Sequence, residues 1–343
     1  MKYLKEFATQ QEYEAYINNN PDLPNVSLID EDESVKYNVK PDYSKEYLTF
    51  VALEDGTFKF NKVGTGNDIQ YSLDGGDTWV ELSANENTPT IHQGEKIMWK
   101  AELTPSSVSG SGKFSSTGRY DVEGNPMSLL YGDNFVGQTS LTGKDSAFLA
   151  LFKYSNKLIN AKKMSLPATT LSNKCYNEMF YECSLLITPP ELPATTLTEM
   201  CYSSMFYNCI NLTTAPDLPA TTLAKSCYIG MFAGCTSLTT APELPAVTLE
   251  DYCYWAMFLG CSGLTTAPEL PATKLKMQCY QQVFENCTNI NYIKMLATSI
   301  GLQSLLNWVN GVSATGTFVK AASQTSLPTG ASGIPDGWTV QNV

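Results

Sequence analysis

The residues best suited to chemistry in this sequence are its ten cysteines, all of which lie between positions 175 and 287. An even number of cysteines can form disulfides in an exported protein. Here each cysteine returns at an equivalent place in successive 26-residue units and alternates with Met, Phe and Leu, and no Cys-x-x-Cys or Cys–His pairing occurs. This pattern favours buried, reduced thiols that act as small hydrophobic side chains over disulfides or metal ligands.

Other catalytic groups are scarce. The chain has one histidine, His92, and one arginine, Arg119, which excludes a two-histidine metal site and an arginine cluster for phosphates or carboxylates. The segment 72–79 resembles the Asp-box hairpin of sialidases, in the pattern Ser-x-Asp-x-Gly-x-Thr-Trp. We expect Asp74 to bond to the turn amides and Trp79 to pack beneath them. Because sialidases also need several arginines, we expect no enzymatic activity and no cofactor.

The charge and hydropathy of the chain limit its partners. A net charge of −12 argues against nucleic acid and anionic membrane surfaces, which bind clustered lysine and arginine. No run of about 18 apolar residues occurs, so we expect no membrane span. The first twenty residues also lack the apolar core of a signal peptide, so we expect no ordinary secretory export.

A repeat dominates the second half of the chain. The hexapeptide at 166–171, Leu-Pro-Ala-Thr-Thr-Leu, returns with small changes at 192–197, 218–223, 244–249 and 270–275. A fixed period of this length is typical of a solenoid, whose units stack on their neighbours. In the unit after Leu197, apolar residues up to Cys209 fall on one helical face, which predicts a short helix. A brief strand should follow at 212–215, closed early by Pro216 and Pro219.

These patterns predict a multidomain α+β protein, in which a small antiparallel β-sandwich precedes an α/β solenoid of about five 26-residue turns and a C-terminal cap. The sandwich is expected to contain hairpins that join 48–53 to 57–60 and 69–73 to 78–82. A helix is expected at 4–17. The predicted boundaries are 1–46 for an N-terminal attachment segment, 47–135 for the sandwich, 136–296 for the solenoid and 297–343 for the cap.

The repeat resembles a known family. The series F-x-x-C-x-x-L-x-x-A-P-x-L-P-A-x-x-L at 206–223 is similar to the BspA-like leucine-rich repeats of gut Bacteroidales and treponemes. That resemblance implies a leucine-rich-repeat fold and adhesion or recognition at a cell surface. The 26-residue period is longer than is usual in that family, and the export signal of a bacterial adhesin is missing. Residues 1–38 are instead similar to N-terminal segments of structural proteins from phages of the same bacteria.

Two interpretations follow from this resemblance. The first is a virion protein, such as a head or tail fibre or decoration, that is assembled in the host cytoplasm. It would bind other virion proteins through its N-terminal segment, form a homo-oligomer, and present the repeats to a host surface protein or glycan. The alternative is a BspA-type adhesin on the bacterial surface that binds a host protein or glycan.

Comparison of the repeats with one another locates candidate binding positions. Three aromatic residues, Tyr181, Tyr207 and Trp255, fall where the units differ, and we expect them to project outward, where aromatic side chains suit contacts with sugars or proteins. Incidental surface aromatics, or packing against a neighbouring subunit, remain the alternative. One acidic residue per turn also forms a candidate column, which either points into solvent or binds Ca²⁺: Glu191, Asp217, Glu243 and Glu269.

Overall fold

The computed structural model describes residues 4–5, 37–38, 42–61, 69–83, 85–104 and 114–343. The chain divides into two compact units, Met1–Tyr43 and Ser44–Val343. In the first unit, β1 (Leu4–Lys5) pairs antiparallel with β2 (Tyr37–Asn38). The predicted helix is therefore wrong at its start, and the remainder of it lies outside the described residues, as does most of the predicted attachment segment.

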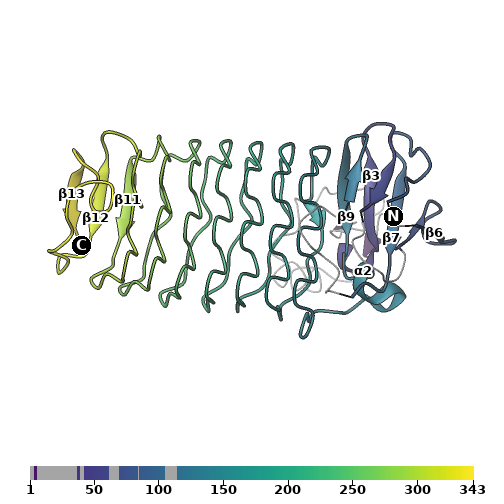
Figure 1. Ribbon diagram of the computed structural model, residues 1–343, viewed down its shortest axis with the longest axis horizontal. Helices are drawn as coiled ribbons and strands as arrows, with labels where there is room; N and C mark the ends of the chain where they lie inside the picture. Colours follow the sequence, from purple (N-terminus) through teal and green to yellow (C-terminus); the bar gives the residue numbers. More distant parts are fainter. Residues whose placement is uncertain (1–3, 6–36, 39–41, 62–68, 84, 105–113) are drawn as a thin grey trace, which may run out of the picture. The chain divides into compact units, whose positions relative to one another are not determined.

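A six-stranded sheet begins the second unit (Figure 1). Its strand order is β10-β9-β3-β7-β5-β6, and every neighbouring pair is antiparallel except β9 and β10. The strands span Leu48–Ala52 (β3), Ile69–Ser72 (β5), Val80–Leu82 (β6), Lys96–Lys100 (β7), Tyr120–Gly124 (β9) and Lys163–Met164 (β10). The predicted hairpin between residues 69–73 and 78–82 is confirmed, since β5 pairs with β6.

A separate two-stranded sheet joins β4 (Phe58–Phe60) to β8 (Phe114–Ser116). The predicted hairpin between 48–53 and 57–60 is wrong, because β3 pairs with β7 and β9 instead. Buried aromatic rings explain the difference. Phe50 on β3 lies 5.3 Å from Phe58 and 4.8 Å from Phe114 between ring centroids, so the two sheets pack across a core rather than edge to edge.

Three short helical turns accompany these sheets. They are η1 (Tyr43–Lys45), α2 (Ser128–Tyr131) and η3 (Gly132–Asn134). The Ser128 hydroxyl donates to the Trp99 carbonyl at 2.8 Å and so ties α2 to β7. In the part of the chain that the structure describes, no other regular helix occurs.

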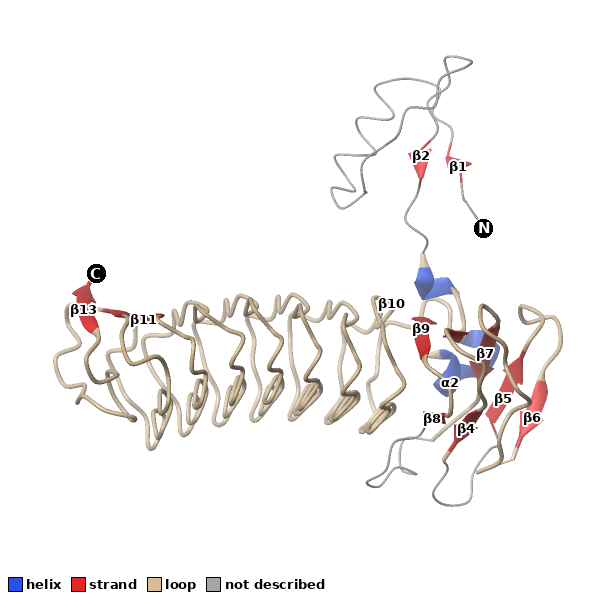
Figure 2. Ribbon diagram, turned by 90° about the horizontal axis from the view of Figure 1, so that it is seen from above, coloured by secondary structure: helices blue, strands red, loops and turns tan. Residues whose placement is uncertain are grey.

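The repeats form a stack of similar coils that begins beside β9, as Figures 1 and 2 show. In each coil the expected helix is replaced by a run of tight turns. Cys175 N–H donates to the Ser172 carbonyl of its own coil at 3.3 Å, whereas the next donor, Tyr176 N–H, reaches the Cys201 carbonyl of the following coil at 3.0 Å. An α-helix would direct every N–H to the carbonyl four residues before it.

Every fourth residue of this run has a left-handed backbone. The φ angles of Lys174, Glu178 and Glu182 are 57°, 54° and 55°. The same triplet occurs seven times, and we number the coils by it: 146/150/154 (coil 1), 174/178/182 (coil 2), 200/204/208 (coil 3), 226/230/234 (coil 4), 252/256/260 (coil 5), 278/282/286 (coil 6) and 303/307/311 (coil 7). Each such residue costs roughly 1–2 kcal/mol outside glycine, so inter-coil bonding and packing must hold it in place.

The predicted fold class, an α+β chain with an α/β solenoid of the leucine-rich-repeat type, is therefore wrong. The coils contain no helix, and regular strands are confined to small sheets. The buried residues repeat with a period of four residues, not with the period of an α-helix. Cys201-Tyr202, Met205-Phe206 and Cys209 are buried at a spacing of four residues, which a chain of turns keeps in register, whereas a helix of 3.6 residues per turn would drift out of it.

Two aromatic ladders fill the interior of the stack. Phe152, Phe180, Phe206, Phe232, Phe258 and Phe284 follow one another with ring centroids 5.4–5.9 Å apart. A parallel ladder of five tyrosines has spacings of 5.7–5.9 Å: Tyr176, Tyr202, Tyr228, Tyr254 and Tyr280. All of these rings are buried. The ladders therefore make the interior of one coil the packing surface for the next.

The phenylalanine ladder continues past the repeats at both ends. Phe152 lies 5.8 Å from Phe50 and 6.0 Å from Phe114, so it joins the core between the two sheets. At the far end Trp308 lies 6.4 Å from Phe284 and donates from Nε1 to the Gly333 carbonyl at 2.8 Å. One hydrophobic core thus runs from β3 to the last coil.

Proline limits regular strands in the stack. From residue 188 to residue 271, the extended segment of each repeat carries two or three prolines, such as Pro216 and Pro219, and forms isolated bridges rather than ladders, as between Thr196 and Thr222. The equivalent segment after coil 6 has no proline, and there the strand β11 (Tyr292–Met295) forms. It leads into a parallel sheet with β12 (Thr317–Lys320) and β13 (Thr339–Asn342). This difference follows from the missing N–H of proline.

Candidate functional site

The outer surface of coils 1 to 3 carries a row of tyrosines. The rings of Tyr181 and Tyr207 are partly exposed and stack with centroids 4.7 Å apart and planes 4° apart. Burial, the Tyr207 hydroxyl and the nearby Glu182 carboxylate raise the pKa of Tyr181 to about 12, so it remains a neutral hydroxyl at physiological pH. The structure therefore brings together two of the three predicted aromatic residues.

A third tyrosine in this row was missed from the sequence. Tyr154 is 52% exposed, and its ring stands perpendicular to that of Tyr181, with the centroids 5.8 Å apart. Lys153 Nζ lies 5.0 Å from the Tyr154 centroid and 4.4 Å from the Tyr181 centroid, and it also pairs with the Glu178 carboxylate. The sequence contains a signal for it: when Phe152 is aligned with Phe180, Tyr154 falls next to the repeat position that holds Tyr181.

A shallow depression of about 510 Å³ opens next to this row. It is lined by one pair of residues from each of three successive coils: Tyr154 and Asn156, Glu182 and Ser184, Asn208 and Ile210. Tyr154, Glu182 and Asn208 occupy the third left-handed position of their coils. This backbone geometry places an aromatic ring, two amides, a carboxylate and a hydroxyl around one hollow.

The third predicted aromatic residue lies elsewhere. Trp255 belongs to coil 5, where its ring centroid is 6.0 Å from that of Tyr252. Its Nε1 donates to Gln282 Oε1 in coil 6 at 2.9 Å. Trp255 is therefore not part of the tyrosine row, and its polar atom is already bonded.

All four carboxylates of the predicted acidic column are exposed. Glu269 forms an ion pair with Lys294 at 2.8 Å. No three Asp, Glu, His or Cys side chains in the described residues come together as metal ligands would. The structure thus offers no arrangement in which Glu191, Asp217 and Glu243 share a cation.

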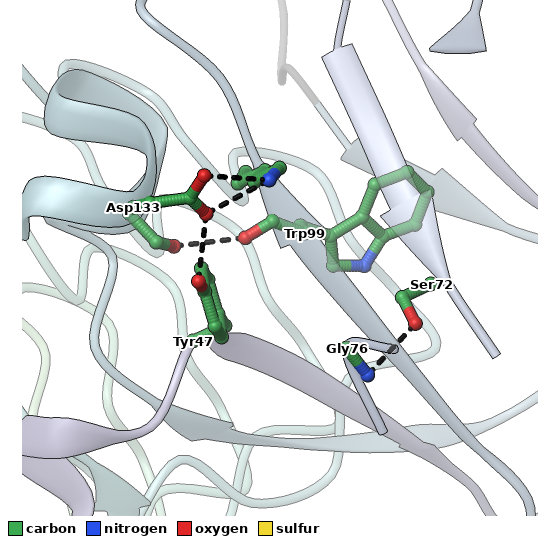
Figure 3. A network of polar contacts seen from close by, with 7 residues as sticks. Tyr47, Ser72, Gly76, Trp99 and Asp133 are labelled. Carbon is green, nitrogen blue, oxygen red and sulfur yellow. Dashed lines mark hydrogen bonds and ion pairs between the residues drawn. The ribbon is translucent and has the colours of Figure 1, made fainter. Parts of the chain in front are cut away.

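The Asp-box turn lies on the six-stranded sheet, and its polar groups bond to one another. Asp74 accepts from Thr78 N–H at 2.9 Å, from Thr78 Oγ1 at 2.5 Å and from the Ser72 hydroxyl at 2.7 Å. The Ser72 oxygen accepts in turn from Gly76 N–H at 2.9 Å (Figure 3). The bonds from Thr78 and Ser72 lower the pKa of Asp74 to about 2. The Asp74 carboxylate therefore stabilises the turn by accepting its hydrogen bonds.

A neighbouring network anchors the predicted partner of this turn, Trp79. Asp133 accepts from the Tyr47 hydroxyl at 2.7 Å and from Lys100 Nζ at 2.8 and 3.0 Å (Figure 3). Lys100 Nζ lies 4.3 Å from the Trp79 centroid, and Trp79 lies 4.9 Å from Tyr47. Burial and the Asp133 carboxylate raise the pKa of Tyr47 to about 12. These groups bind one another and hold the hairpin on the sheet.

The prediction of buried, unpaired cysteines is confirmed. The second cysteine of each repeat donates from its thiol to the carbonyl of the ladder phenylalanine in the preceding coil, at 2.9–3.1 Å; these are Cys183, Cys209, Cys235, Cys261 and Cys287. Burial raises the pKa of every cysteine, to about 12 for Cys201. A protonated, enclosed thiol is neither a nucleophile nor a metal ligand.

No family model, no curated protein and no solved structure matches this chain. None of the helices in the described residues has both the length and the apolar character needed to cross a membrane.

Proposed function

We propose that this chain is a non-enzymatic structural protein of a virion, a head or tail fibre or decoration, whose stacked coils recognise a host or surrounding surface. The observation that carries the proposal is the contrast between the inside and the outside of the coils. The interior repeats the same Cys, Tyr and Phe side chains, each at most 1% exposed. The repeat position that holds Tyr181 and Tyr207 is instead Ala233 in coil 4, Leu259 in coil 5 and Glu285 in coil 6.

This contrast supports binding rather than catalysis. A constant core fixes the coil spacing, while outer positions can vary without cost to packing. The tyrosine row of coils 1 to 3 supplies rigid, amphipathic contact area of the kind that dominates recognition surfaces. The virion setting rests on the resemblance of the N-terminal segment to phage structural proteins.

Purified phage particles from a Bacteroidales host provide the test. Peptide mass spectrometry should find this chain in particles that survive a density gradient, and antibody labelling should place it on their outside. Recovery of the chain from the bacterial outer surface, with none in particles, would replace the proposal with the alternative of a bacterial adhesin that binds host protein or glycan.

A further inference from the structure

The lining of the depression on coils 1 to 3 includes one aromatic ring, that of Tyr154, with about half of its surface exposed. Tyr181 and Tyr207 cover each other's faces at 4.7 Å. Tyr154 turns perpendicular to them, is half exposed, and lines the hollow. An exposed ring at the edge of a hollow is a stacking surface for the apolar face of a ligand.

The other lining residues offer hydrogen-bonding groups without a metal or a thiol. Asn156, Glu182 and Ser184 line the hollow with an amide, a carboxylate and a hydroxyl. Together they supply donors and acceptors at short intervals. A volume of about 510 Å³ lies within the range of sites for small ligands.

The local charge selects against anions. None of the six residues that line the hollow is cationic. Lys153, which precedes Tyr154, is paired with Glu178 and lies against two tyrosine rings. The one charged residue of the lining is the carboxylate Glu182, on a chain whose net charge is −12.

We propose that this depression binds an uncharged, hydroxyl-rich sugar, which stacks on Tyr154 and donates hydroxyl hydrogen bonds to Glu182. The inference rests on the proposed recognition function and names its ligand class. A sugar has an apolar ring face that matches Tyr154 and dense hydroxyl groups that match the polar lining residues. A sialylated or sulfated form of the same glycan would bring its anion toward the Glu182 carboxylate and bind less well.

An array of immobilised oligosaccharides tests the proposal with the full chain, each core being present in neutral, sialylated and sulfated form. The chain should bind a neutral core and bind its sialylated form at least about tenfold more weakly. Tyr154→Ala should weaken neutral binding by about tenfold or more. Tyr252→Ala is the matched control, because Tyr252 also has a left-handed backbone but lies in coil 5, and it should change nothing.

A second variant separates shape from charge. Glu182→Gln keeps a hydrogen-bonding side chain on a left-handed backbone, a conformation that Gln278 and Gln282 also adopt at the first two left-handed positions of coil 6. It should leave neutral binding within about threefold and remove the discrimination against sialylated cores. Thermal unfolding should match the parent protein for both variants.

Three outcomes would overturn the inference: stronger binding of anionic than neutral cores, unchanged binding by Tyr154→Ala, or no bound sugar from a chain that still binds host cells. The last outcome leaves the proposed recognition function standing, with a protein receptor. A chain that binds neither cells nor sugars would overturn both.

Discussion

At the scale of single residues, the ten cysteines show how burial converts a reactive side chain into a packing element. Half of them donate a thiol hydrogen bond to a phenylalanine carbonyl of the neighbouring coil. The others lie beside the ladder tyrosines, equally buried. Because no thiol reaches solvent, we expect none to react in the native protein.

Ellman's reagent tests this expectation. The native chain should show no fast-reacting thiol, and the chain in guanidinium chloride should show all ten. Rapid reaction of even two thiols before unfolding would contradict the packing of the coils. A surface cysteine introduced by Thr240→Cys, at an exposed position, provides the positive control.

The same thiols predict a loss of stability at high pH. Burial raises their folded pKa values above the unfolded value of about 8.5. The folded state therefore binds more protons above that pH, and stability is full below it and falls as pH rises, by up to about 1.4 kcal/mol per pH unit for each thiol. Chemical denaturation at pH 7, 9 and 10.5 measures this. An unfolding free energy that stays constant up to pH 10.5 would refute it.

At the scale of the element, the coil depends on residues held at positive φ. Ala256 has a φ of 52°, and a β-branched side chain there meets its own backbone. We expect Ala256→Val to lower the free energy of unfolding by about 1–2 kcal/mol. Ala256→Gly should stay close to the parent, since Gly230 fills the equivalent place in coil 4. Equilibrium denaturation in guanidinium chloride is the measurement.

A matched alanine elsewhere in the repeat serves as control. Ala224 is outside the left-handed positions, and other repeats carry Thr198, Glu250 or Lys276 there. Ala224→Val should therefore cost less than about 0.5 kcal/mol. Equal costs at both positions would indicate a regular helix, in which the two sites are alike.

The sequence predicted which side chains are buried far better than it predicted the backbone. The helical period placed Cys201, Met205 and Phe206 on one buried face, and all three are buried. Each coil contains only about three turns of this pattern, and over so short a run the buried positions fit a period of 3.6 residues as well as a period of four. The better signal was glycine or asparagine at the third left-handed position of five coils: Asn208, Gly234, Gly260, Asn286 and Gly311.

The candidate site was predictable only in part for a related reason. Tyr181 and Tyr207 were found because they share a repeat position. Tyr154 lies in coil 1, which is 28 residues before coil 2 instead of 26, so a strict period omits it. The hollow depends on the left-handed corners of three coils, which the helical interpretation did not contain.

At the scale of the second unit, each coil bonds to the coils before and after it. Stability should then be close to a sum over coils and their interfaces. Removal of one complete 26-residue period should leave a folded, shorter stack, because Leu-Pro-Ala-x-x-Leu segments meet in the same register at the junction.

Two such deletions, compared for binding to host cells, test the central claim that this stack recognises a surface through its first three coils. Deletion of 250–275 removes coil 5 with Trp255, and deletion of 172–197 removes coil 2 with Tyr181 and Glu182. Both proteins should unfold cooperatively. We expect the first to bind cells like the parent and the second to lose at least about tenfold in affinity. Equal binding by the two folded deletions, or loss confined to the deletion of coil 5, would contradict the account.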